Sequence, residues 1–524
     1  SNLGLEFEPN GSMFRVYTFS VIAIFILVIA CVNYMNLTTA RSLRRAKEVG
    51  MRKVLGAKRF DLLNQFLTES FIMTGVAIIL ALAFATVLLP EFNQFAGKQI
   101  AASVIFSPKV LLTLFASLII IGLIAGLYPA FMLSSFRPLN SMKSNNAGKS
   151  GFVMRKGLVV VQFAISIGLI AASAIVFQQW DFMKNKSLGI NKDMLITVPL
   201  QTMDRQQIGA FTTELAKIPS VQRVGHSNMR MPGWIGNSTA YKAEDVPQAD
   251  SEGKSMKIIR IDYEFLTTIQ ASIIDGRNFS INMPVDSASL ILNESAVEQL
   301  GWKDPIGKWL ELNGRRFNIV GIVKDFHFES LHREIAPIIF ILNPRQLAFS
   351  YIRIESQDVA GTLAQVKNTY QKFVSNRDFT YTFVNDDIEV QYVAEKKFTE
   401  VFTLFTVLAI IIACLGTFGL ISFTAERKSK EIGIRKVLGA SAGNVSFMLI
   451  KEFLILLLIA SLIAWPLSYY LLDGWIEGFV YRTSIGAMPF IVATALAGMI
   501  VLLTTGFRAL KAAMVNPVES LRDE

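Results

Sequence analysis

The sequence predicts a polytopic α-helical membrane protein with seven predicted spans and one large extracytoplasmic mixed α/β domain. Hydrophobic residues make up 52% of the chain and charged residues only 18%, and the mean hydropathy is +0.43. A soluble protein of this size needs more charge to cover its surface. The apolar residues also collect in runs of about 20 or more, the length that crosses a bilayer. Between two groups of such runs lies a segment, 179–398, that reads as alternating strands and helices.

The apolar runs give the spans, and the basic residues give their direction. Short loops rich in Lys and Arg mark the cytoplasmic side. Basic residues cluster after the first span, between the third and fourth, and after the fifth, whereas the loops 91–107 and 474–487 hold only Lys98 and Arg482. The N-terminus and 179–398 are therefore expected outside and the C-terminus inside. The predicted spans are 17–39, 66–89, 109–132, 157–178, 400–423, 448–472 and 488–510.

The net charge of +10 thus reports membrane topology, and we expect no nucleic-acid partner. The two cysteines, Cys31 and Cys414, both fall inside spans. They cannot form a disulfide framework and have no metal-ligand spacing.

An internal repeat organises the chain. KEVGMRKVLGA (47–57) returns as KEIGIRKVLGA (430–440), identical at nine of eleven positions, and Cys31 and Glu69 recur as Cys414 and Glu452 at the same offset of 383. The order of span, basic segment, span, short loop and span is also repeated. The predicted domains are a remnant of an extracytoplasmic segment (1–16), a first three-span unit (17–144), a cytoplasmic linker with the fourth span (145–178), an extracytoplasmic α/β domain with stalk helices (179–398), and a second three-span unit with a cytoplasmic tail (399–524).

The second three-span unit follows a span and an outside domain that the first one lacks. We therefore expect the chain to be an N-terminally truncated version of an eight-span protein with two outside domains. Within 179–398, hydrophobic alternation predicts strands at 193–200, 255–262, 289–293, 315–326, 351–355 and 379–386, and helices at 205–217, 293–300 and 359–374. The flanks 180–187 and 389–402 have helical spacing and are expected to be stalks that continue into the membrane.

The repeated segment reads as a short amphipathic helix at the inner membrane surface. Glu48 and Arg52 stand four apart with the acid first, the more favourable order. Gly50 and Gly56 lower helix propensity, which suggests close packing or a helix end, and LGA at 55–57 reads as a stop. A lipid anchor needs only positive charge. Because two copies keep the same order of Glu, Gly, Arg and Lys, we expect instead a partner that recognises shape.

This motif, following a span in a unit with a large outside domain, resembles the FtsX-like permeases of ABC transporters, of the macrolide-exporter and lipoprotein-release type. The resemblance covers essentially the whole chain, in a duplicated form. It implies that the repeated segments are coupling helices that dock a cytoplasmic ABC ATPase dimer. The implied docking residues are Lys47, Glu48, Gly50, Arg52, Lys53, Gly56, Lys430, Glu431, Gly433, Arg435, Lys436 and Gly439.

The resemblance further implies a multi-pass protein of a bacterial inner membrane that works by mechanotransmission: a separate ATPase closes, the spans and stalks tilt, and the outside domain moves to export a drug, peptide, lipid or lipoprotein. ATP and Mg²⁺ would be bound by that ATPase, so no cofactor, metal or catalytic residue is expected here. A periplasmic adaptor and an outer-membrane channel are further partners that the family allows, beside the lipid bilayer. The alternative is a regulatory platform that moves a periplasmic or cell-wall partner without transport.

Several other patterns favour structural roles. AGKS (147–150) ends like a phosphate loop but lacks the first glycine and the preceding strand. His327, Glu329 and His332 are spaced wrongly for one helical face and read as a polar loop. The polar and small residues inside spans, namely Asn33, Asn36, Gln162, Gly122 and Gly126, are expected to pack against other helices. Glu69 and Glu452 could pair with the docking helix or reach the membrane interface, and the sequence leaves both options open.

Overall fold

The structure is a computed structural model, and the chain forms two compact units. The helical unit comprises Ser1–Trp180, Glu395–Ile476 and Thr483–Glu524, and the α/β domain comprises Asp181–Ala394 and Glu477–Arg482. The residues that the structure describes are 13–44, 51, 52, 55, 58–134, 149–200, 203–247, 253–329, 331, 333–355, 357–375 and 377–514.

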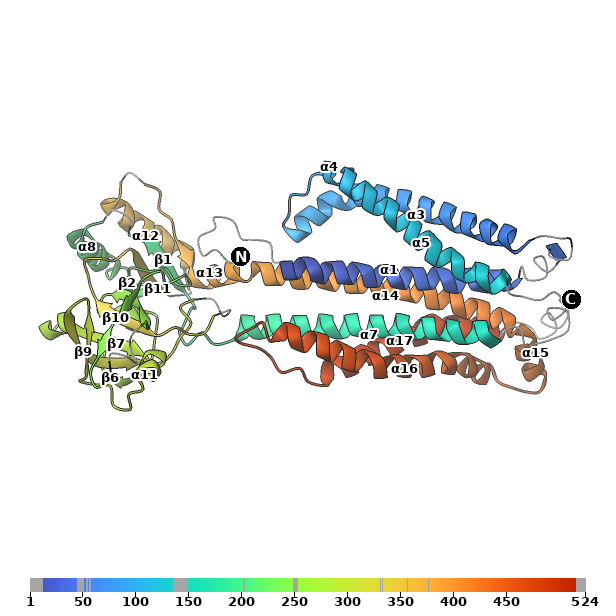
Figure 1. Cartoon of the computed structure of the whole chain (residues 1–524). Helices are drawn as coiled ribbons and strands as arrows, with labels where there is room; N and C mark the ends of the chain where they lie inside the picture. Colours follow the sequence, from blue (N-terminus) through green and yellow to red (C-terminus); the bar gives the residue numbers. More distant parts are fainter. Residues whose placement is uncertain are drawn as a thin grey trace. The chain divides into compact units, whose positions relative to one another are not determined.

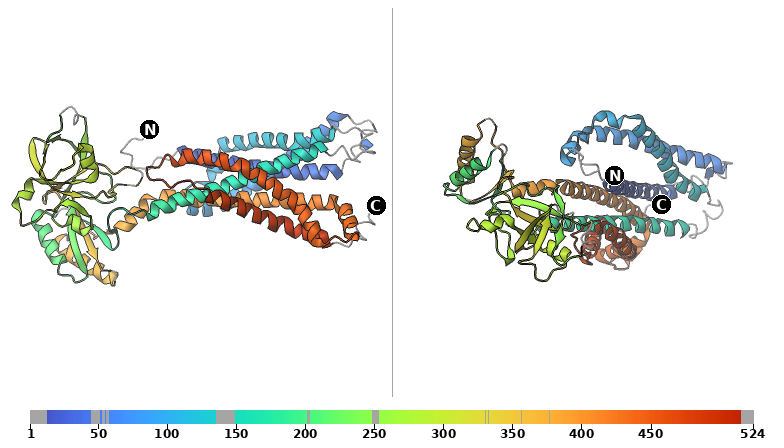
Figure 2. Two further views of the ribbon diagram at one scale, coloured as in Figure 1. Left: turned by 90° about the horizontal axis from the view of Figure 1, so that it is seen from below. Right: turned by 60° about the vertical axis from the view of Figure 1, so that its left-hand side comes forward.

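Among the described residues, the first half of the helical unit contains three long helices and one short one. α3 and α5 pack along each other (Figure 2). Their contact depends on two glycines of α5: a Cβ on Gly122 would come within 2.6 Å of Phe71 Cδ1, and one on Gly126 within 3.0 Å of Ser70 Oγ. These glycines therefore let the helices approach closely, as the sequence predicted. The helices are α1 (Met13–Arg44), α3 (Arg59–Ala96), α4 (Ala102–Ile105) and α5 (Pro108–Ser134) (Figure 1).

The second half of the helical unit has a continuous apolar core. Val159 and Ile167, Ile421, Leu449 and Ala493 are all buried in one cluster, and they come from four different helices. Apolar side chains at a helical period thus bury one face of each helix. The elements are α7 (Lys149–Asn185), α14 (Val393–Arg427), α15 (Ser429–Val437), α16 (Ala442–Ile476) and α17 (Met488–Met514).

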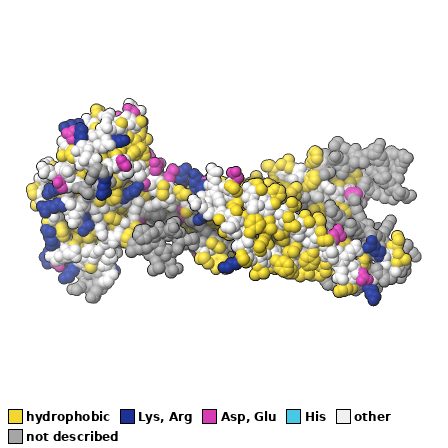
Figure 3. Space-filling view, turned by 90° about the horizontal axis from the view of Figure 1, so that it is seen from above, with side chains coloured by type: hydrophobic (Ala, Val, Ile, Leu, Met, Phe, Trp, Pro, Cys, Tyr) yellow, Lys and Arg dark blue, Asp and Glu magenta, His cyan; other side chains and the backbone are white. Residues whose placement is uncertain are grey.

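Within the described residues, six helices are long and apolar enough to cross a membrane. They coincide with six of the seven predicted spans, and the third predicted span coincides with α5, whose described apolar stretch is Pro108–Ile124. The helical unit also exposes many large apolar side chains, such as Ile79, Phe84 and Leu503. On the face shown in Figure 3, yellow apolar side chains cover most of the described surface of these helices. A surface of this kind suits a lipid environment.

Polar side chains inside the apolar helices bind neighbouring helices. Asn33 Nδ2 on α1 donates to the carbonyl of Ile412 on α14 at 2.6 Å, and Gln162 Nε2 on α7 donates to the next carbonyl, Ala413 O, at 2.9 Å. A Cβ on Gly416 would overlap Asn33 Oδ1, so the Asn33 amide occupies the space that a side chain at position 416 would need. These contacts confirm the prediction that Asn33 and Gln162 face other helices.

The α/β domain contains a mixed sheet flanked by helices. Its described strands follow the order β12-β1-β11-β2-β5-β10-β7-β9-β8-β4, with β3 beside β5 and β6 beside β9. Only the β5–β10 and β7–β9 pairs among those described are parallel. The strands are β1 (Leu195–Pro199), β2 (Val221–Ser227), β3 (Ser238–Ala240), β4 (Lys242–Ala243), β5 (Ser255–Ile261), β6 (Ile273–Gly276), β7 (Ser289–Asn293), β8 (Trp309–Leu312), β9 (Arg315–Val323), β10 (Ile338–Leu342), β11 (Phe349–Ile354) and β12 (Thr382–Phe383).

Two strand–helix–strand units build one end of this sheet. Helices α8 (Arg205–Leu215) and α12 (Val359–Phe373) lie side by side against β1, β2 and β11 (Figure 1). Phe211 and Tyr370 meet edge to face between them, with ring centroids 6.0 Å apart. The remaining short helices are α10 (Phe265–Thr268), the 3₁₀ helix η1 (Pro284–Ala288), α11 (Glu294–Leu300) and α13 (Val384–Gln391).

One predicted strand is largely wrong. The segment 379–386 forms only the two-residue β12 before α13 begins at Val384. Asp386 and Asp387 stand in the first turn of α13, where negative charge favours a helix. Asp387 also accepts two hydrogen bonds from Arg230, at 2.6 and 3.1 Å. The stalk likewise has a break, at Tyr392 between α13 and α14.

Candidate functional site

The second copy of the repeated segment forms the predicted helix, α15. Glu431 and Arg435, the counterparts of Glu48 and Arg52, make an ion pair at 2.9 Å with the acid one turn before the base. Both side chains are about half exposed, so the pair supports the helix only weakly.

Glycines shape this helix and its end. Gly433 and Ile432 are on the buried side of α15, and Ile432 is only 3% exposed. After Val437 the chain turns through Gly439, whose φ is +91°, a backbone conformation that side-chain-bearing residues rarely adopt. There Gly439 N donates to Lys436 O and Ala440 N to Arg435 O, so the helix ends by the glycine stop that the LGA pattern predicts.

The exposed face of α15 combines apolar and basic groups. Ile434 is 48% exposed, Val437 66% and Leu438 80%, and Arg435 and Lys436 stand between them in the sequence. Apolar side chains surrounded by cations fit a groove with an apolar floor and an acidic rim. The described part of the chain thus exposes at α15 a surface that combines apolar and basic side chains.

The first copy is only partly described. The residues of the first copy that lie outside the described part of the chain include Lys47, Glu48, Gly50, Lys53 and Gly56. In the second copy, the Lys430 side chain also lies outside it. Arg52 is exposed and donates from Nη1 to Gln65 Oε1 on α3 at 3.0 Å. Leu55, the counterpart of Leu438, is also 80% exposed. At the described positions the two copies therefore present the same kinds of side chain.

α15 is held firmly to the helix that follows it. Lys428, the residue that precedes α15, pairs with Glu452 of α16 at 2.7 Å. Ile432 packs in the same cluster as Val445 and Leu449 of α16. Glu452 thus pairs with the residue directly before α15, which is close to the first of the two options that the sequence left open for it. Its counterpart Glu69 is exposed on α3.

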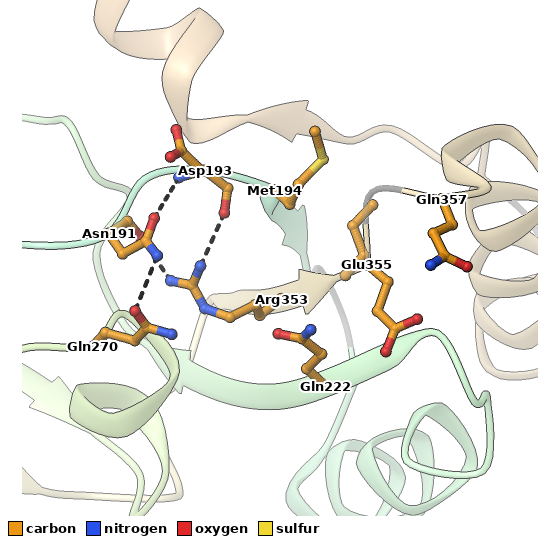
Figure 4. A pocket seen from close by; sticks show the side chains of 9 residues that line it. Asn191, Asp193, Met194, Gln222, Gln270, Arg353, Glu355 and Gln357 are labelled. Carbon is orange, nitrogen blue, oxygen red and sulfur yellow. Dashed lines mark hydrogen bonds between the residues drawn. The ribbon is translucent and has the colours of Figure 1, made fainter.

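A polar cavity of about 370 Å³ opens in the α/β domain (Figure 4). Its wall includes Arg353, which is only 4% exposed. The guanidinium donates from Nε to Thr268 O, from Nη1 to Asp193 O and from Nη2 to Asn191 O, at 2.9, 2.9 and 2.7 Å, and burial lowers its pKa. Because all three nitrogens are engaged by the chain, Arg353 joins segments rather than presenting a charge to a ligand. No pattern in the sequence predicted this cavity.

The polar loop at 327–332 has structural contacts. His327 is 6% exposed, and its ring meets the Tyr481 ring edge to face, with centroids 4.7 Å apart. Burial, and then the nearby Lys186 charge, lower the pKa of His327 to about 4. Glu329 Oε1 accepts from Ile235 N at 2.7 Å. His332 lies outside the described residues, as does the start of AGKS, whose Lys149 and Ser150 begin α7.

The apolar helices, the repeated helical block and the inserted α/β domain define a multi-pass membrane protein of the permease class. The FtsX-like permease C-terminal family model matches residues 20–138 and 403–517, and the MacB-like periplasmic core domain model matches 160–374. The chain therefore belongs to the FtsX-like permeases that carry a MacB-like periplasmic core domain.

Curated relatives match one part of the chain. The Macrolide export ATP-binding/permease protein MacB of Bdellovibrio bacteriovorus is 30% identical over 122 residues, 23% of this chain and 18% of the relative. The protein of the same name from Agrobacterium fabrum is 28% identical over 123 residues, 24% of this chain and 18% of the relative. The match thus spans less than a fifth of these relatives' length.

Solved structures match part of this chain at low similarity. The periplasmic region of MacB from Actinobacillus actinomycetemcomitans covers 39% of this chain and 95% of its own, with 15% identity and a TM-score of 0.28. The extracellular domain of the noncanonic ABC-type transporter YknZ from Gram-positive bacteria covers 36% and 98%, with 14% identity and a TM-score of 0.26.

Proposed function

We propose that this chain is the membrane permease subunit of an ATP-driven exporter or extractor that works by mechanotransmission. A separate cytoplasmic ABC ATPase dimer docks on the two repeated segments, and the α/β domain stands on the opposite side of the membrane and moves when the ATPase closes. The relatives' name, which joins ATP binding to a permease, supports this pairing. ATP and Mg²⁺ belong to the ATPase in this proposal.

The observation that carries the proposal is the surface of α15 and its attachment. Ile434, Val437 and Leu438 expose apolar area beside Arg435, while Ile432 and the Lys428–Glu452 pair fix the helix to α16. A force applied to the exposed face of α15 therefore reaches the spans without bending a loop. A lipid anchor would need no such rigid attachment on its other face.

The continuous helices α7 and α14 support the second half of the proposal. α7 runs from Lys149 to Asn185 and α14 from Val393 to Arg427, each long enough to cross a bilayer with turns to spare. Both helices reach the α/β domain by direct chain continuation. Because a helix transmits displacement along its axis with little loss, each is suited to act as a stalk.

Copurification tests the docking. Reversing Arg52 and Arg435 to Glu should abolish recovery of the ATPase with the tagged permease, because two cations facing an acidic rim become two anions. Lys98→Glu, which reverses an exposed cation in the short loop on the predicted outer side, is the matched control and should leave recovery unchanged. Normal ATPase recovery with the double reversal would refute the docking surface. A transport assay on ATPase-bound protein then separates export from the regulatory alternative.

A further inference from the structure

The first part of the loop between α16 and α17 belongs to the α/β domain. Glu477–Arg482 falls in that domain, whereas the residues that flank it, Ile476 and Thr483, belong to the helical unit. The chain thus enters the domain not only through α7 and α14 but also through this six-residue loop, which the sequence predicted only as a short connection between spans.

Aromatic side chains anchor the loop in the domain. Phe479 and Tyr481 pack against the buried cluster that contains Phe326 and Phe328. The Tyr481 ring meets His327 edge to face, with centroids 4.7 Å apart, and Lys186 Nζ lies 4.1 Å from the centroid of the same ring. Tyr481 is therefore clamped between a buried imidazole and an ammonium group.

The next part of the loop follows the same helix within the helical unit. Thr483 N donates to Gln179 Oε1 on α7 at 2.9 Å, and the Gln179 side chain is only 1% exposed. Lys186, which holds Tyr481, comes directly after the end of α7 at Asn185. The strap, defined as residues 477–483, thus contacts α7 near its end and the residue that follows this helix.

We propose that Tyr481 is a positioning residue through which α16 and α17 act on the α/β domain, as a third connection beside α7 and α14. This inference rests on the proposed function. α15, the docking helix, is fixed to α16 by Lys428 and Glu452, and α16 runs without a break to Ile476 at the foot of the strap. A displacement of α15 therefore has a route to the domain through one helix and one aromatic anchor. With three connections the domain resists rotation about the two stalks.

The test compares movement of the domain in variants of the whole chain, reconstituted with the copurified ATPase. Spin labels on an exposed residue of α8 and on Lys98 of the helical unit report the distance change on adding ATP and Mg²⁺. Tyr481→Ala should reduce this change about threefold or more, with ATP hydrolysis and ATPase recovery as in the wild type. Tyr481→Phe keeps the ring and should retain the change. Tyr470→Ala, at a 78% exposed position on α16, is the matched control and should also retain it.

The outcomes separate this inference from the proposed function. A full distance change in Tyr481→Ala would overturn the role of the strap while leaving mechanotransmission intact. No distance change in the wild type, or no recovered ATPase, would instead count against the proposed function. Hydrogen exchange of the β9 and β10 amides reports whether the domain of Tyr481→Ala is folded. If the domain of Tyr481→Ala is not folded, the same distance is measured in Lys186→Met, which removes only the cation beside Tyr481. A full distance change on adding ATP and Mg²⁺ to Lys186→Met would then overturn the proposal.

Discussion

Replacing Arg353 by methionine is expected to destabilise the α/β domain by about 3 kcal/mol. Arg353 joins the chain before β1, at Asn191 and Asp193, to the end of α10 at Thr268 through three hydrogen bonds. Methionine fills similar volume but donates nothing, so three carbonyl groups lose a charged donor.

The magnitude follows from the exposure of those carbonyls. A hydrogen bond to a charged group contributes about 1.5–3 kcal/mol, which would give well above 4 kcal/mol if all three losses counted fully. Asn191 and Asp193 lie on a partly exposed segment, where water replaces the lost donor. Thr268 is fully buried, so its carbonyl is left unsatisfied at about 1–3 kcal/mol. Together these terms give about 3 kcal/mol.

Hydrogen exchange on the whole chain measures this loss locally. The amides of β1 should exchange about 100-fold faster in Arg353→Met, because each 1.4 kcal/mol corresponds to about tenfold. Arg353→Lys should recover little, since one ammonium cannot reach three carbonyls as the planar guanidinium does. The matched control is Arg223→Met on β2, directly opposite Arg353 in the sheet register. Its side chain is 51% exposed and pairs with Glu264 at only 3.4 Å, so the expected cost is below about 1 kcal/mol.

Exchange in Arg353→Met within about threefold of the wild type, a difference of about 0.6 kcal/mol, would contradict the stabilising role of Arg353. Equal acceleration of exchange in Arg223→Met and Arg353→Met would contradict it as well. In that case any cation on β2 or β11 would stabilise the domain as much as the three hydrogen bonds that Arg353 donates to backbone carbonyls.

Three further outcomes are expected. Gly416→Ala should lower the thermal stability of the detergent-solubilised protein, because its Cβ would overlap the Asn33 amide on α1. Gly498→Ala, whose Cβ would meet Leu457 at an ordinary 3.4 Å, is the control and should not lower it. Equal melting temperatures of the two variants would contradict this prediction. The pKa of His327 is lowered from 6.5 to about 4, so the unfolded state takes up the proton at a higher pH than the folded state, and the domain should lose stability as the pH falls from 6.5 towards 4. His327→Gln should flatten that part of the curve of stability against pH. An unchanged curve would exclude this histidine as the cause. The Lys428–Glu452 pair is about one-quarter to one-third exposed, so a double-mutant cycle of Lys428→Met and Glu452→Gln should give a coupling of about 1 kcal/mol or less, and a value near 3 kcal/mol would indicate a far drier site.

Local pattern predicted the parts of the fold whose hydrophobic period is unbroken. The strand at 289–293 and helices near 205–217 and 359–374 agree closely with β7, α8 and α12. The two helices combine a helical period with a side-chain cap at the start: Asp204 and Asp358 accept a hydrogen bond from a backbone N–H in the first turn of α8 and α12. Where the sequence supplies both signals, tertiary structure rarely overrides them.

The misses have a different physical origin. β10 (Ile338–Leu342) is a wholly apolar run between β5 and β7, and five apolar residues without alternation do not distinguish a central strand from other buried chain. The segment 379–386 alternates well, but Asp386 and the next residue, Asp387, lie in the first turn of α13, and Asp387 binds Arg230, more than 150 residues earlier in the chain. A contact at that sequence separation leaves no local signal.

The helix α15 and its end were predicted from the sequence, but its attachment to α16 was not, and its docking role stays a prediction. The Glu431–Arg435 pair and the Gly439 stop could be derived from spacing alone. That Ile432 faces the core while Val437 and Leu438 face outward depends on where α16 lies, which spacing does not give. For the strap, the two aromatic residues in the short loop, Phe479 and Tyr481, were a signal that could have been used, since a purely connecting loop has no reason to carry them.

The α1–α14 crossing affects which repeat of this chain can pack against which. Asn33 and Gly416 occupy the same place in the two repeats, 383 residues apart, and they face each other across the crossing. If two copies of the first repeat packed together, one Asn33 amide would face another. If two copies of the second repeat did, one Gly416 would face another, which would leave a gap and no donor for the Ile412 carbonyl. Each half is thus a better partner for the other than for itself, which favours keeping both in a single polypeptide over a return to identical subunits.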